Sequence, residues 1–199
     1  MTGKGATVML PLHLQNEVIH PDGQIHAGFG GPDDDRLAFV SAASAALRTA
    51  VEAGVQRVFV RMAFQPGGAD LPDNCELYQS VKHNEVMREG SWGAEFFGAL
   101  APDAATDIIV SHNRVNAFFA TDLEKILSDC DCDHVVLFGV ATHSVVEHTA
   151  RHAADLGLKV TLVEDACSAF PRDRHTASLS AIKNLVTVVP SRELALGGS

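Results

Sequence analysis

Basic residues are scarce in this chain: its 199 residues include 15 lysines and arginines against 25 aspartates and glutamates, a net charge of −10. Nucleic acids are bound through a basic surface that neutralises phosphates, so we expect no nucleic-acid partner. Long apolar runs are also missing, and none approaches the roughly 20 residues that cross a bilayer. We therefore expect no membrane partner either.

Metal-binding cysteine patterns are absent as well. The four cysteines include no C-x-x-C pair, and Cys130 and Cys132 form only a C-x-C, which we interpret as two incidental thiols. The N-terminal segment has one lysine and a short apolar run, which does not resemble a signal peptide. These features predict a cytoplasmic protein with reduced cysteines.

Short apolar runs alternate with helical patterns along the chain. The runs at 7–12, 57–62, 107–110, 135–138, 159–163 and 186–189 are predicted strands, whereas 33–53, a segment beginning at 121, a segment ending at 157 and 173–184 are predicted helices. Strands separated by helices indicate right-handed crossovers and a mainly parallel sheet covered on both faces. We predict one α/β domain, residues 1–199, with three layers around a six-stranded sheet.

Residues 65–90 lack a clear pattern and begin with several glycines, prolines and aspartates. A loop of this length in a compact domain usually has a function. Because it follows the end of a predicted strand, we expect an irregular segment that forms one wall of an active site.

The stretch 139–157 reads G-V-A-T-x-x-x-V-x-x-T-A-R-x-A-x-x-x-G and joins a strand to a helix through a tight turn. It resembles the nucleophile turn of the isochorismatase-like hydrolases, also called the cysteine hydrolase superfamily. The resemblance implies a Rossmann-like three-layer fold, a cis peptide at Val140–Ala141, and assembly into homodimers or homotetramers.

Two further segments carry the resemblance over most of the chain. H-L-Q-N-E at 13–17 is similar to the family's D-x-Q-N-D, and residues 109–123 are similar to V-x-x-K-x-R-x-S-A-F-x-x-T-x-L. The family uses the Asp and Lys of these segments to activate a Cys at the nucleophile turn. At the matching positions this chain has His13, His112 and Val145.

Val145 has no nucleophilic atom, which excludes an acyl-enzyme at that position. Ser144 is adjacent, but successive side chains at a helix start point about 100° apart, which makes it a poor substitute. Isochorismatases proper also lack the Cys and protonate a vinyl ether instead. We therefore predict a hydrolase of small polar molecules, with an amide-like, urea-like or vinyl-ether-like bond, in which His13 and His112 act as general acid and base. The alternative is an inactive family member that serves as a ligand-binding or partner subunit.

The remaining predicted site residues surround this pair. Expected substrate contacts are Trp92, Asn116, Phe118, Ala141, Thr142, His143 and Val145. We predict no cofactor and assign no metal ligand. One metal alternative stays open, because His148 and His152 stand one helical turn apart, a spacing that can chelate a divalent ion.

Overall fold

The structure, a computed structural model, describes residues 5–30 and 33–196. Its strands form one parallel sheet in the order β3-β2-β1-β4-β5-β6. They are β1 (Ala6–Leu12), β2 (Gln56–Met62), β3 (Ile108–His112), β4 (Cys132–Val140), β5 (Lys159–Ser168) and β6 (Thr187–Val189). The predicted six-stranded α/β sheet is confirmed.

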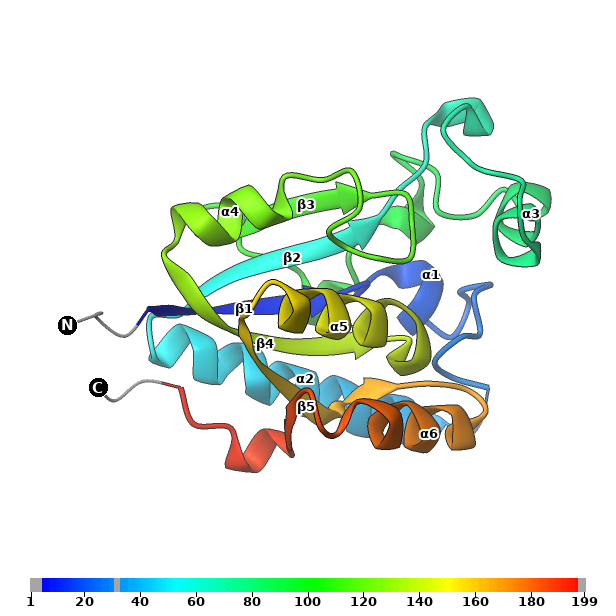
Figure 1. Ribbon diagram of the computed structural model, residues 1–199. Helices are drawn as coiled ribbons and strands as arrows, with labels where there is room; N and C mark the ends of the chain where they lie inside the picture. The colour runs from blue at the N-terminus through cyan, green and yellow to red at the C-terminus, as the bar shows by residue number, and fades with distance from the viewer. Residues whose placement is uncertain (1–4, 31–32, 197–199) are drawn as a thin grey trace.

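Helices cover both faces of the sheet (Figure 1). The α-helices of the described residues are α1 (Asn16–Ile19), α2 (Asp33–Glu52), α3 (Glu76–His83), α4 (Leu123–Asp129), α5 (Glu147–Asp155) and α6 (Arg172–Ile182). With right-handed crossovers this strand order places α2 on one face and α4, α5 and α6 on the other. Within the described ranges, no helix combines the length and apolar character that a membrane crossing requires.

The central strands are buried on both faces, which explains their uninterrupted apolar sequence. In β1 every residue from Val8 to Leu12 is buried, and in β4 the buried run extends from Val135 to Val140. Successive side chains of a strand point to opposite faces, so a run in which every residue is buried is covered on both faces. Their side chains therefore form the core between the two helical layers.

The prediction of an irregular segment at 65–90 is wrong in its middle, where α3 spans Glu76–His83. Only Tyr78 and Val81 are buried in this helix, three residues apart on one side. The other residues are mostly polar, so a pattern of two apolar positions was too weak to indicate a helix. In Figure 1, α3 stands apart from the sheet, beyond the carboxyl ends of the strands.

Two strands also extend further than their apolar runs predicted. β4 begins at Cys132 and β5 continues to Ser168, and their ladder still pairs Gly139 with Cys167 and Val140 with Ser168. The hydrogen bonds between these two strands continue beyond their apolar runs. A hydrophobic pattern in the sequence does not predict such an extension.

The close approach of β4 to β1 depends on Gly139. This residue has φ of +139°, and a Cβ built on it would lie 2.0 Å from the carbonyl oxygen of Leu12. The obstacle is backbone of a neighbouring strand and has no rotamer with which to move away. A glycine here therefore lets the carboxyl ends of β1 and β4 lie side by side.

We expect Gly139→Ala to lower the free energy of unfolding by about 2–4 kcal/mol, because the strain of the positive φ and the collision with β1 add together. Gly157→Ala is the matched control: Gly157 has φ of +84° and no atom within 4 Å of its added Cβ. It should cost only about 1 kcal/mol. Urea unfolding of both variants measures the difference, and equal losses would show that the contact with Leu12 is unimportant.

Candidate active site

His13 and His112 meet at the carboxyl edge of the sheet. His13 directly follows β1, with φ of +53° and its N–H donating to the carbonyl of Val60 (2.9 Å). His112 ends β3, and its Nε2 lies 2.5 Å from Nε2 of His13. The ring centroids are 4.8 Å apart with planes inclined by 47°. One imidazole must therefore donate to the other in a direct hydrogen bond.

The pair is enclosed by protein: His13 is 7% exposed and His112 is 4% exposed. Nδ1 of His112 lies 3.4 Å from the carbonyl oxygen of Asn116. His112 thus has a backbone partner in addition to the other ring.

Burial makes both imidazoles weak bases. It lowers the pKa of His112 to about 4, against which the carbonyl of Asn116 acts weakly. Burial, with the charge of a protonated His112 as the second cause, lowers the pKa of His13 well below its ordinary 6.5, and the hydrogen bond with Val140 opposes this. Both rings are therefore neutral at pH 7.

The turn after β4 brings the nucleophile position to the same edge. The Val140–Ala141 peptide is cis, as the family resemblance predicted. The carbonyl of Ala141 then accepts from the N–H groups of Ser144 (3.0 Å) and Val146 (3.4 Å), which gives a wide π-type turn before α5. Val145 is 1% exposed and packs in the core. Its place holds an apolar side chain with no atom able to attack a carbonyl.

Thr142 is fully buried and bonds to a histidine that the sequence did not single out. Its Oγ1 lies 2.8 Å from Nδ1 of His175 on α6. Burial lowers the pKa of His175 to about 4, and the charge of Arg172 adds to the effect. Ser178, one turn later on α6, donates to the carbonyl of Thr142 (3.2 Å). The sequence predicted this helix at 173–184 but gave no signal for the contact of His175 with Thr142.

His143 is half-buried, and its Nδ1 has no hydrogen-bond partner among the described residues. Burial lowers its pKa, the charge of Arg174 lowers it further, and Glu147 opposes both. His143 is the one histidine among the predicted contact residues of this turn, and its Nδ1 is not hydrogen-bonded to the described protein.

Asn116 and Phe118 lie in the loop after β3, close to the pair, and both contact His152. Nδ2 of Asn116 lies 3.0 Å from Nδ1 of His152, and the ring of Phe118 stacks on that histidine at 4.4 Å. Trp92 lies on a separate segment, is 48% exposed, and meets the ring of His20 edge-on at 5.0 Å. A role of these three residues in binding substrate stays a prediction.

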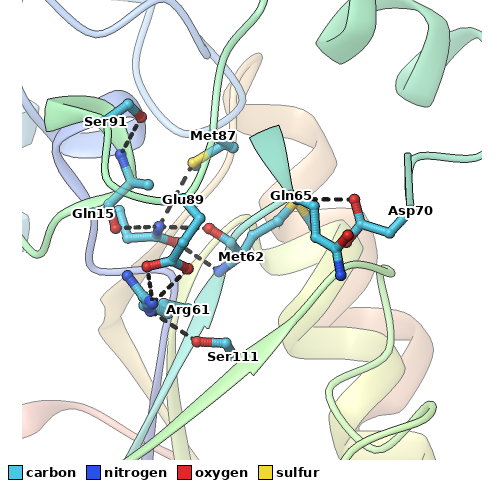
Figure 2. Close-up of polar contacts among 10 residues, drawn as sticks. Gln15, Arg61, Met62, Gln65, Asp70, Met87, Glu89, Ser91 and Ser111 are labelled. Carbon is cyan, nitrogen blue, oxygen red and sulfur yellow. Dashed lines mark hydrogen bonds and ion pairs between the residues drawn. The ribbon is translucent and has the colours of Figure 1, made fainter. Parts of the chain in front are cut away.

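Gln15 is hydrogen-bonded to Met62 at the end of β2 (Figure 2). Its Nε2 donates to the carbonyls of Met62 and Ala94, each at 2.8 Å, and its Oε1 accepts from the N–H of Met62 at 2.8 Å. Nearby, Arg61 donates to both carboxylate oxygens of Glu89 at 2.7 Å (Figure 2). These bonds join β2 and Gln15 to the segment that contains Glu89 and Ala94.

His148 and His152 do not converge. Nδ1 of His148 contacts the carbonyl of Ser144 at 3.0 Å, whereas His152 contacts Asn116. Across residues 5–30 and 33–196, no three His, Cys, Asp or Glu side chains come together as ligands for a metal ion. A cavity of about 530 Å³ lies elsewhere, between Phe39 and Phe170, and neither histidine of the pair lines it.

The lowered pKa of His112 predicts a stability that falls with acid. In the unfolded chain His112 takes up a proton as the pH falls below its ordinary pKa of 6.5, but in the folded chain it does so only near pH 4. The contribution of His112 to the free energy of unfolding is therefore constant above pH 6.5 and is lost as the pH falls from 6.5 to about 4. We expect His112→Gln to reduce that loss by up to about 1.4 kcal/mol per pH unit. Urea unfolding across this range measures the slope. The exposed His148→Gln is the control, and an unchanged slope in His112→Gln would contradict the burial argument.

Comparison with known proteins places this fold and turn in one family. Residues 7–193 of the chain match the family described as the Isochorismatase domain. The uncharacterized isochorismatase family protein YecD from Escherichia coli O157:H7 is 39% identical over 88 residues, which are 44% of this chain and 47% of that protein. The match therefore spans about half the length of that relative.

Longer matches are less identical. A "Probable inactive nicotinamidase" from Arabidopsis thaliana is 27% identical over 187 residues, 93% of this chain and 92% of that protein. Maleamate amidohydrolase from Pseudomonas putida is 28% identical over 160 residues, 80% of this chain and 74% of that enzyme.

The crystal structure of an isochorismatase family protein from Desulfovibrio vulgaris has the same fold, with a TM-score of 0.83, 20% identity, and coverage of 95% of this chain and 96% of that one. The family match covers nearly all of the sequence, and the solved structure shares its architecture. The chain belongs to the isochorismatase family.

Proposed function

We propose that the protein hydrolyses a small polar molecule, with an amide-like or ureido C–N bond or a vinyl ether, by general acid–base catalysis without a covalent intermediate. The observation that carries this proposal is the direct Nε2–Nε2 hydrogen bond of His13 and His112, 2.5 Å long. Amide chemistry is also supported by the name of one relative, maleamate amidohydrolase. We propose no covalent step because the buried side chain of Val145 has no nucleophilic atom.

The neutral pair offers one N–H donor and one imidazole lone pair at a single point. When substrate enters, we propose that the rings part and a water molecule bridges them, accepting from the donor ring and donating to the acceptor ring. As the water oxygen attacks the carbonyl carbon, the acceptor ring takes a water proton. That imidazolium then gives the proton to the leaving nitrogen as the C–N bond breaks, and the pair is neutral again.

The lowered pKa values set the pH dependence of this reaction. Imidazoles usually lose their base function below about pH 6.5, but burial lowers the pKa of His112 to about 4. The pair therefore keeps its lone pair in mild acid. Turnover is expected to be flat from pH 7 to about pH 5 and to fall as the pH drops through about 4.

Replacing either histidine by Gln should lower kcat/KM about 10²-fold or more on a substrate found by screening amides, ureido compounds and vinyl ethers. The double variant should lose little more, because the two rings act as a unit. His148→Gln, a change of the same kind on an exposed residue of α5, should retain full activity. Loss in only one of the two single variants would contradict the paired mechanism.

Val145→Cys should not produce amidase activity by acyl-enzyme chemistry. A thiol becomes a nucleophile as its thiolate, and the two neutral imidazoles nearby are hydrogen-bonded to each other. Mass spectrometry after mixing with amide substrates is expected to show no acylated protein. A trapped acyl adduct on the introduced thiol would overturn this view of the pair.

A second candidate function is ligand binding without turnover. It is favoured by the burial of both rings and by the backbone partner that His112 already has. The relative named a probable inactive nicotinamidase is consistent with it. Under this alternative, a compound from the same screen raises the thermal unfolding temperature but is recovered unchanged after prolonged incubation with the protein.

A further inference from the structure

We infer that Asn116 and His152 are positioning residues that fix the tautomer of His112 and thereby divide the roles in the pair. His112 is the base that accepts the water proton, and His13 is the ring that donates a hydrogen bond. This inference rests on the proposed function for its catalytic meaning, whereas the tautomer itself is a property of the resting protein.

The assignment begins at the carbonyl of Asn116. A carbonyl oxygen only accepts hydrogen bonds, and it lies 3.4 Å from Nδ1 of His112. In the neutral ring the proton is therefore on Nδ1, which leaves Nε2 with its lone pair. Because that nitrogen lies 2.5 Å from Nε2 of His13, the proton between the rings belongs to His13. His112 is consequently the acceptor.

The side chain of Asn116 holds this carbonyl in place. Its Oδ1 accepts from the backbone N–H of Phe118 at 3.0 Å, so the atom that faces His152 must be the amide nitrogen. That nitrogen can only donate, which requires Nδ1 of His152, 3.0 Å away, to be unprotonated. In this series of hydrogen bonds each donor thus meets an acceptor. Which ring nitrogen carries a proton follows from the N–H of Phe118, which can only donate, and the carbonyl of Asn116, which can only accept.

His152 is itself held by packing. Its ring stacks on Phe118 with centroids 4.4 Å apart and planes inclined by 9°, and it belongs to α5, the helix that follows the nucleophile turn. These contacts join the loop after β3 to α5. Without the hydrogen bond from Asn116 to His152, the peptide of Asn116 could rotate and release Nδ1 of His112.

The test compares two substitutions at one position. His152→Gln keeps an oxygen acceptor for Asn116, whereas His152→Leu removes it, and both lose the stacked ring. Nitrogen-15 NMR of the histidine rings at pH 7 reports which nitrogen of His112 carries the proton. We expect the Nδ1–H form in the wild type and in His152→Gln, and a mixture of both tautomers in His152→Leu.

Two further variants frame the result. Asn116→Ser removes the same hydrogen bond from the loop and should give the same mixture, which guards against a fold-specific effect of leucine. His148→Leu, one turn earlier on α5, should leave the spectrum of His112 unchanged. An Nε2–H tautomer of His112 in the wild type, or an unaltered Nδ1–H form in both His152→Leu and Asn116→Ser, would overturn the inference.

Turnover provides the second measurement. With a substrate in hand, kcat should fall about tenfold in His152→Leu with little change in KM, and His152→Gln should restore it. If no substrate is turned over, the proposed function fails while the ring spectra still decide the tautomer. Equal kcat values in the leucine and glutamine variants would overturn the positioning role.

Discussion

Parallel pairing of β1 with β4 is the constraint on which the candidate site depends. The strand order reverses between these two strands, so the connections after them leave on opposite faces and the carboxyl edge stays open between them. His13 follows one strand and the nucleophile turn follows the other, while His112 joins them from β3. Gly139 lets the two strand ends approach, since any Cβ there meets the backbone of β1.

Burial then determines the chemistry of the groups placed at this edge. A buried charge is costly unless it is paired, whereas two neutral imidazoles satisfy each other with one hydrogen bond. The pKa of both His13 and His112 is lowered for this reason. Such a pair can hold or transfer a proton, but it cannot replace a thiol, and Val145 supplies none.

Amide side chains hold the loops around the pair in place. The side chain of Gln15 bonds to the backbone N–H and carbonyl of Met62 (Figure 2). Asn116 connects the loop after β3 to His152 on α5. An amide has both donors and an acceptor, so it can join two segments that share no secondary structure. Gln15 and Asn116 therefore join the segments that carry the histidine pair to their neighbours.

The sequence by itself determined the fold class and the family resemblance, because strand periodicity and motif order are local signals. The resemblance, carried over position by position, also identified His13 and His112 as a pair worth testing. Only the tertiary structure decided that their Nε2 atoms bond directly, that burial lowers their pKa, that His175 bonds to Thr142 and that His152 bonds to Asn116. His13 and His112 are 99 residues apart in the chain. No local pattern records the distance between two such side chains after folding.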